Sequence, residues 1–272
     1  MWTARPAWAI LLTIVATLVA ASGSGLALVV PASMPLGQRI VGGCATALVA
    51  VGLVVLWRRH LVRRPWSGVA LSWSWRSLGE GLLGIGVAAA AILAAQSACV
   101  AADACEWVPL SGAEIPLWAI LASTFVSAVL LQGFPEELLW RGNLTDLLGR
   151  RFGPAMVLFI TSAAFGLLHL VSNGSQQGAG EHVLYVIMAT ALGFACGAAR
   201  LRTGSTWAAV GVHGGFHLAK GLAPAQPESL SVLLVAWTVA LTVAGFALLA
   251  VRLPASPRRD AAANGRENVR PR

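Results

Sequence analysis

The chain has 272 residues, of which 57% are hydrophobic and only 11% are charged. Soluble domains carry about 25% charged residues, so this composition excludes an ordinary soluble domain and predicts a membrane protein. The net charge of +8 does not point to nucleic acid as a partner, because the arginines cluster between apolar segments and near the C-terminus, as they do in the loops of membrane proteins.

Apolar segments long enough to cross a bilayer follow one another along the chain. A transmembrane helix needs about 20 mainly apolar residues. The expected spans are 7–30, 37–57, 79–101, 115–140, 154–172, 183–200, 205–220 and 229–252. The seventh is short, and a small-residue stretch from Ser22 to Gly25 interrupts the first. The pattern predicts an all-α polytopic membrane protein, with eight transmembrane helices in a single domain over 1–252. A basic tail over 253–272 is expected to be disordered.

The basic residues predict the direction of these spans. Cytoplasmic loops carry an excess of Lys and Arg. With the N-terminus inside, all 19 basic residues except Arg39 and Lys220 fall on the cytoplasmic side. Both termini are therefore expected in the cytoplasm. The chain is expected to be a multi-pass protein of the bacterial plasma membrane, with the lipid bilayer as a partner.

The four cysteines do not form a C-x-x-C pair, so a structural zinc site is not expected. Cys44 and Cys196 lie in apolar runs and are expected to be packing residues. Cys99 and Cys105 bracket a short loop that is expected outside the cytoplasm. A disulfide could form there, although spacing alone does not establish it.

Ionisable residues inside apolar segments indicate a functional site, because charge is costly in hydrocarbon. Glu136 and Glu137 lie near the end of the fourth expected span. His169 lies in the fifth, and His213 and His217 lie in the seventh. Carboxylates and imidazoles that helix packing brings together could perform acid–base chemistry in the membrane. Taken singly, each histidine could instead be a core residue bonded to a backbone carbonyl.

The two glutamates differ in their expected partners. Glu137 and Arg141 are four residues apart, so they share a helix face and can form an ion pair. Glu136 points to another face and has no such partner, which makes it the candidate general base. A leucine stripe extends this helix toward a turn at 150–153. In an antiparallel hairpin, residues equidistant from the turn face each other, so Glu136 is expected to meet His169.

At these residues the chain resembles the CPBP family of intramembrane endopeptidases, which includes CAAX prenyl proteases and bacteriocin-processing proteins. The family motifs are Glu-Glu-x-x-x-Arg, Phe-x-x-x-His and His-x-x-x-Asn. Their counterparts are Glu136, Glu137 and Arg141, then Phe165 and His169, then His213 and His217. Histidine thus replaces the family's asparagine at the last position. The resemblance implies an eight-helix bundle with a conical cavity open to one side, and a catalytic core at about 115–220.

The resemblance also implies a membrane-embedded peptidase that acts on a peptide or protein substrate at the membrane. Glu136 would activate a water molecule for attack on the peptide carbonyl. His169 would hold or polarise that water, and His213 would stabilise the oxyanion. The supporting residues would be Glu137, Arg141 and His217. The substrate could be a prenylated C-terminal peptide, a leader peptide or a membrane protein.

Metal dependence stays open at the level of sequence. Glu136, His169, His213 and His217 could supply a shell for zinc or another divalent metal. No His-Glu-x-x-His motif is present, however, and water activation by a glutamate needs no metal. A mechanism without a cofactor is therefore preferred.

Two functions other than proteolysis fit the same residues. A non-catalytic immunity or scaffold protein would keep the fold and bind a peptide, and the histidine at 217 favours that alternative. A proton-coupled transporter would use the glutamates and histidines as a relay. Against transport, no inverted repeat is visible, and the charges gather in one region.

Overall fold

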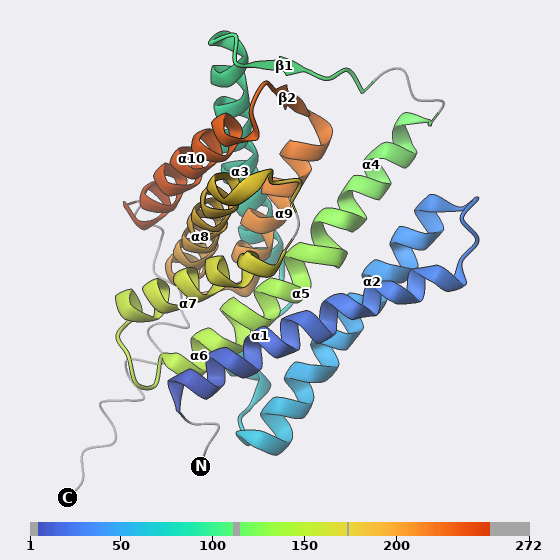
Figure 1. The fold of residues 1–272 in the computed structure, drawn as a ribbon. Coiled ribbons are helices and arrows are strands. Elements are labelled where there is room, and N and C mark those ends of the chain that lie inside the picture. The colour runs from blue at the N-terminus through green and yellow to red at the C-terminus, as the bar shows by residue number, and fades with distance from the viewer. Residues whose placement is uncertain (1–4, 111–114, 173, 251–272) are drawn as a thin grey trace, which may run out of the picture.

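The computed structural model describes residues 5–110, 115–172 and 174–250, and it is mostly helical, as predicted (Figure 1). Within these residues, seven helices are long and apolar enough to cross a membrane. They are Pro6–Val29, Pro35–Leu61, Trp75–Ala101, Leu117–Leu148, Pro154–Val171, Gly178–Thr203 and Leu230–Ala250. The tail predicted at 253–272 lies outside the described residues.

The span predicted at 205–220 forms helix α9 (Thr206–Leu222), which is not one of the seven. With 17 residues it is shorter than the length of about 20 residues that a full crossing needs. Most of its residues are buried, because other helices surround it. α9 is therefore an internal helix of the bundle, and the count of eight membrane-crossing helices stays a prediction.

The bundle contains two apolar cores. The first core lies among α3 (Trp75–Ala101), α8 (Gly178–Thr203), α9 and α10 (Leu230–Ala250). The second lies among α1 (Pro6–Ser22), α2 (Pro35–Leu56), α7 (Pro154–Leu168) and the second half of the helix Leu117–Leu148. α7, which belongs to the second core, lies beside α8, which belongs to the first (Figure 1). Residues that project from both groups of helices meet at the boundary between the two cores.

The helix from Leu117 to Leu148 changes its winding on either side of the paired glutamates. Its α-helical parts are α4 (Leu117–Phe125), α5 (Phe134–Glu137) and α6 (Thr145–Leu148). The stretches Val126–Gly133 and Leu138–Leu144 between them are π-helical, a geometry that is frequent at functional sites. The helix continues past residue 140 and turns into α7 at 149–153, as the leucine stripe predicts.

α9 packs on α3 with the two backbones in direct contact. A Cβ atom on Gly84 would meet the carbonyl oxygen of Ala208, and one on Gly211 would meet that of Gly81. One turn further along α9, a Cβ atom on Gly215 would lie 2.6 Å from a backbone oxygen of α3. Glycine at these positions therefore allows α9 to lie at the centre of the bundle.

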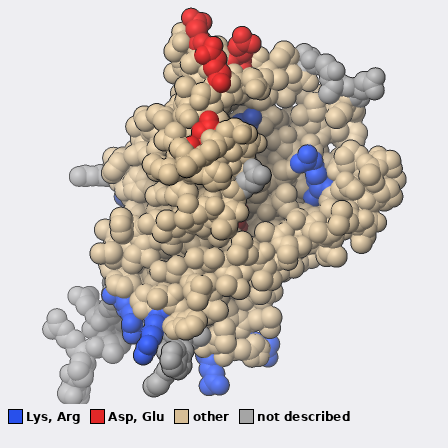
Figure 2. All heavy atoms as spheres, viewed as in Figure 1, with Lys and Arg blue, Asp and Glu red and all other residues tan. Residues whose placement is uncertain are grey.

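Opposite charges gather at opposite ends of the molecule (Figure 2). Basic residues lie where α2 ends and where α6 turns into α7: Arg58, Arg59, Arg63, Arg64, Arg150 and Arg151. Acidic residues lie at the other end, near β1 (Cys105–Trp107) and β2 (Ala225–Pro227): Asp103, Glu106 and Glu228. This separation is the one that the positive-inside rule predicts. The cytoplasmic location of the termini stays a prediction.

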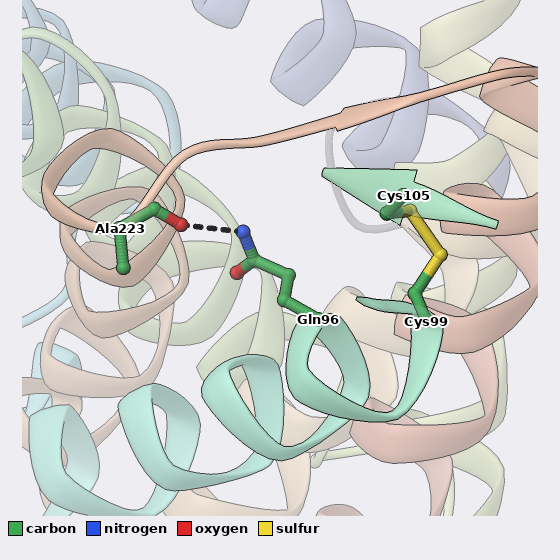
Figure 3. The surroundings of a disulfide bond; sticks show 4 residues. All are labelled: Gln96, Cys99, Cys105 and Ala223. Atoms are coloured by element: carbon green, nitrogen blue, oxygen red, sulfur yellow. Dashed lines mark hydrogen bonds between the residues drawn. A yellow bond between two sulfur atoms is a disulfide. The ribbon is translucent and has the colours of Figure 1, made fainter. Parts of the chain in front are cut away.

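A disulfide closes the acidic end of the bundle (Figure 3). Cys99 at the end of α3 is bonded to Cys105 in β1, so the disulfide that the spacing left open is present. β1 pairs antiparallel with β2, and Gln96 Nε2 donates a hydrogen bond of 2.7 Å to the carbonyl oxygen of Ala223. These contacts tie the end of α3 to the end of α9.

Candidate active site

A buried ion pair between Glu137 and Arg141 lies at the boundary of the two cores. Arg141 Nη1 donates to Glu137 Oε1 at 3.0 Å, and both side chains are 0% exposed. Arg141 Nη2 donates to the carbonyl oxygen of Gly193 at 2.7 Å, which links this helix to α8. The ion pair predicted from the spacing is therefore present, and the charge of each partner is compensated inside the protein.

His213 joins the ion pair from α9. Its Nδ1 lies 2.9 Å from Glu137 Oε1. Because an ionised carboxylate only accepts hydrogen bonds, Nδ1 carries a proton and Nε2 is the nitrogen left for a ligand. Gly133 allows α9 to lie close to the helix that carries Glu137, since a Cβ atom at Gly133 would lie 3.2 Å from the backbone nitrogen of Gly214.

His169 lies at the end of α7 with its tautomer set by the backbone. Its Nδ1 is 2.8 Å from the carbonyl oxygen of Phe165, one turn earlier. A carbonyl only accepts, so Nδ1 donates, and Nε2 of the neutral ring is a hydrogen-bond acceptor. The ring also packs against Tyr185, with 5.6 Å between the ring centroids.

Phe165 is the apolar residue that the candidate polar groups share. Its ring centroid lies 4.7 Å from the Arg141 guanidinium carbon, 4.8 Å from the His169 ring and 5.9 Å from the His213 ring. The side chain is fully buried. The aromatic residue of the second motif thus fills the space between the ion pair and both imidazoles.

Glu136 differs from Glu137 in having no hydrogen bond or ion pair to its side chain among the described residues. Its Oε2 atom is buried without a hydrogen-bond partner, while the residue as a whole is partly exposed. Glu136 therefore keeps an oxygen that could bind water. The expected meeting of Glu136 with His169 across the hairpin stays a prediction.

His217 lies one turn beyond His213 on α9. The two imidazole rings are stacked, with 5.2 Å between centroids and 22° between planes. His217 is partly exposed, and no side-chain hydrogen bond involves it within the described part of the chain. It therefore extends the imidazole surface that begins at His213.

Among the described residues, one group of metal-ligating side chains has its donor atoms within 4.8 Å of one another: Glu137, Cys196 and His213. All three are buried. The structure does not bring the predicted set, Glu136, His169, His213 and His217, into such a group. Cys196 was expected only as a packing residue, because a single cysteine in an apolar run carries no chemical signal. Cys44, with the same expectation, is exposed, so that prediction was wrong.

The group around Glu137 does not fit a metal ion. The Arg141 guanidinium already donates to the Glu137 carboxylate, and a metal bound there would lie beside this buried positive charge. The same Glu137 oxygen is also bonded to His213. Glu137 Oε1 is therefore shared by Arg141 and His213, while Glu137 Oε2 is buried without a hydrogen-bond partner among the described residues, and no step of a reaction is assigned to a metal.

A comparison with known families matches the segment that contains this site. Residues 116–219 match the model of the Rce1-like family, the type II CAAX prenyl endopeptidases. A comparison with curated proteins gave no match. The matched segment contains every candidate residue from Glu136 to His217, and the match confirms the resemblance indicated by the three motifs. With its seven apolar helices, the chain is an integral multi-pass membrane protein that carries a protease-family segment.

Proposed function

We propose that the protein is an intramembrane endopeptidase that hydrolyses a peptide bond of a membrane-associated or lipidated peptide or protein. The environment of Glu136 carries this proposal. Its neighbour Glu137 is fully buried, and one of its oxygens accepts hydrogen bonds from both Arg141 and His213. Glu136 is partly exposed and makes no such bonds, so it is the carboxylate left to hydrogen-bond a water molecule.

Glu136 and His169 would activate the attacking water together. Nδ1 of His169 is committed to the Phe165 carbonyl, so Nε2 can accept one hydrogen bond from the water. Glu136 takes the other proton as the water oxygen bonds to the peptide carbonyl carbon. Glu136 then gives that proton to the leaving amine nitrogen as the carbon–nitrogen bond breaks, which yields a carboxylic acid and an amine.

His213 would stabilise the oxyanion that forms on the carbonyl oxygen. Its Nδ1 donates to Glu137, so Nε2 can also donate only when the ring carries both protons. The Glu137 carboxylate stabilises the resulting positive charge, and Arg141 holds that carboxylate in place. His217, one turn further on, would supply a second donor in place of the asparagine.

The proposed orientation puts the basic end of the bundle in the cytoplasm of a bacterial cell, with both termini on that side. Two independent observations support it. Arginines gather at one end of the molecule, as the positive-inside rule requires. The Cys99–Cys105 disulfide lies at the other end, and disulfides form and persist in oxidising compartments outside the cytoplasm.

The test is peptide cleavage by the purified full-length protein in detergent. The panel includes prenylated C-terminal peptides and leader peptides. Glu136→Gln keeps the shape of the side chain and removes the base, so cleavage is expected to fall by about 10²- to 10⁴-fold. Glu228→Gln serves as the control, because Glu228 is an exposed carboxylate at the acidic end of the molecule. This variant is expected to cleave the peptides as fast as the original protein.

Two further arms of this experiment address the metal and the immunity alternative. Cleavage is expected to survive chelation and to survive His217→Asn, which restores the family motif. Stoichiometric zinc, lost together with activity on chelation, would contradict the metal-free mechanism. Peptide binding without cleavage across the whole panel would contradict proteolysis and support an immunity or scaffold protein.

A further inference from the structure

The chain contains a single tyrosine, Tyr185 in α8, and this residue contacts the candidate active site. Its ring packs against the imidazole of His169, with 5.6 Å between the ring centroids and 64° between the planes. The side chain is partly buried and also packs against the first apolar core. The proposed mechanism uses His169 and assigns nothing to Tyr185, so it leaves the contact between the two rings without a role.

The contact forms where α7 and α8 lie side by side and approach closely (Figure 1). A Cβ atom on Gly166 would lie 2.9 Å from the carbonyl oxygen of Val186 and would also meet the side chain of Thr190. Gly166 lies three residues before His169, and Val186 follows Tyr185 directly. Because a glycine lets the two backbones approach at this point, the side chains of His169 and Tyr185 can meet beside it.

The turn that follows His169 packs against the phenol ring of Tyr185. A Cβ atom on Gly174 would lie 2.7 Å from the ring carbon Cε2 and 3.0 Å from the hydroxyl oxygen. The Gln176 side chain holds this turn, because its Nε2 donates to the carbonyl oxygen of Ser172 at 3.2 Å and its Oε1 accepts from the backbone nitrogen of Gly174. Tyr185 therefore contacts both His169 and the backbone beyond it, which limits the movement of its ring.

The orientation of the His169 imidazole depends on more than its hydrogen bond. Nδ1 donates to the carbonyl oxygen of Phe165 at 2.8 Å, and a single hydrogen bond leaves an imidazole free to tilt. The Phe165 ring lies 4.8 Å from the imidazole, and the Tyr185 ring lies 5.6 Å from it. Aromatic rings at such distances attract each other in preferred orientations. Two aromatic contacts, one from α7 and one from α8, therefore restrict the direction in which Nε2 points.

We propose that Tyr185 is a positioning residue, which holds the His169 imidazole so that Nε2 can accept a hydrogen bond from the attacking water. This role rests on the proposed peptidase function. The contact with His169 is made by the aromatic ring, so the ring and not the hydroxyl group carries the role. Reacting groups displaced by about 1 Å can lose roughly 10²-fold in rate, so loss of the contact is expected to slow cleavage.

The first test compares steady-state cleavage by the purified full-length protein in detergent with cleavage by variants at this position. Tyr185→Leu removes the aromatic ring and keeps a large apolar side chain. Its kcat is expected to fall by about 10- to 100-fold while KM changes little, because the contact orients a group of the enzyme. Tyr185→Phe restores the ring alone and is expected to recover most of the lost kcat. Val183→Ala, at an exposed position of α8, is the control and is expected to keep the original kcat.

Gly174→Ala tests the same contact from the other side and leaves Tyr185 and His169 in the chain. The added Cβ atom would displace the phenol ring, so kcat is expected to fall. Gly180→Ala is the matched control, because Gly180 lies in the first turn of α8 and a Cβ atom there has nothing within 4 Å. Its kcat is expected to stay unchanged. A variant whose melting temperature matches that of the original protein is folded, and its kcat then reports the orientation of His169.

Fluorine NMR detects the contact without a peptide substrate. The chain has one tyrosine, so growth with 3-fluorotyrosine labels residue 185 alone. The resonance is expected to shift in His169→Ala, because the label loses the neighbouring imidazole ring. His60→Ala is the control, because His60 is exposed in the short helix Trp57–Leu61 that follows α2. Its fluorine resonance is expected to stay in place.

The outcomes separate this proposal from the proposed function. An unchanged fluorine resonance in His169→Ala would overturn the contact, whether or not the protein cleaves peptides. Equal kcat values for Tyr185→Leu and the original protein would overturn the positioning role, while Glu136-dependent cleavage would still support the peptidase. A Tyr185→Phe variant as slow as Tyr185→Leu would also overturn the proposal, because the hydroxyl group would then carry the role.

Discussion

At the scale of residues, a single oxygen of Glu137 accepts hydrogen bonds from both Arg141 and His213. A buried carboxylate is tolerated when an opposite charge and hydrogen bonds compensate its desolvation. This network engages Glu137, whereas the neighbouring Glu136, the base in our proposal, is outside it. The two adjacent glutamates of this chain thus have different surroundings: Glu137 is buried and hydrogen-bonded to His213, and Glu136 is partly exposed.

Removing one partner of the ion pair is expected to be costly. Arg141→Met and Glu137→Gln each leave an uncompensated buried group, and each is expected to lower the free energy of unfolding by about 3–5 kcal/mol. The double variant is expected to lose less than the sum of the two, because neither charge is then left alone. Melting temperatures in one detergent would test this, and strictly additive losses would show that the pair is not coupled.

At the scale of elements, the contact between α3 and α9 sets the position of two histidines. A Cβ atom on Gly84 would lie 2.8 Å from the backbone nitrogen of Val212, and would also meet the carbonyl oxygen of Ala208. These neighbours are backbone atoms and cannot rotate away. α9 would have to shift, and His213 would shift with it.

Gly84→Ala is therefore expected to lower stability by about 1–3 kcal/mol and to reduce cleavage. Gly86→Ala is the matched control, because it lies two residues along the same helix and a Cβ atom there has nothing within 4 Å. The control is expected to be neutral or slightly stabilising. Melting temperature and cleavage rate would be measured for both. Equal effects would show that helix propensity matters more than the contact between the helices.

The disulfide at the ends of α3 and β1 is a second constraint on α9. Replacing both cysteines, Cys99→Ser with Cys105→Ser, is expected to lower stability by about 2 kcal/mol, as for a short closed loop. A reducing agent is expected to lower the melting temperature of the original protein to that of the double variant. The melting temperature of the double variant itself is expected to stay unchanged. A shift in the double variant would mean that the reductant acts elsewhere.

At the scale of the whole molecule, apolar length and charge predict the helices because the bilayer imposes both. The spans and the turn near Pro154 follow from these rules. The interruption seen at Ser22 also corresponds to a real change, since α1 ends there and a 3₁₀ helix, Gly23–Val29, follows. The length of α9 could not be predicted from these rules, because a helix inside the bundle does not have to match the thickness of the bilayer.

The parts of the site that depend on helix rotation could not be predicted. Glu137 and Arg141 pair within one helix, so their spacing is sufficient to predict the contact. The approach of Cys196 to Glu137 depends on how α8 turns against another helix. The hydrogen bond from Gln96 to Ala223 joins residues 127 positions apart. Contacts between such distant residues leave no periodic pattern in the sequence, so they could not be predicted from it.

α9 is fastened at both of its ends. At its start, Thr206 donates hydrogen bonds to the carbonyl oxygens of Val69 and Ala70. At its far end, Gln96 holds the carbonyl oxygen of Ala223, and the β1–β2 pairing follows directly. Because α9 is hydrogen-bonded to other elements at both ends, sliding it along its axis would break the hydrogen bonds at one end or the other. If the protein cleaves peptides as proposed, we therefore expect the movement that admits a substrate to come from helices other than α9, while His213 and His217 keep their positions.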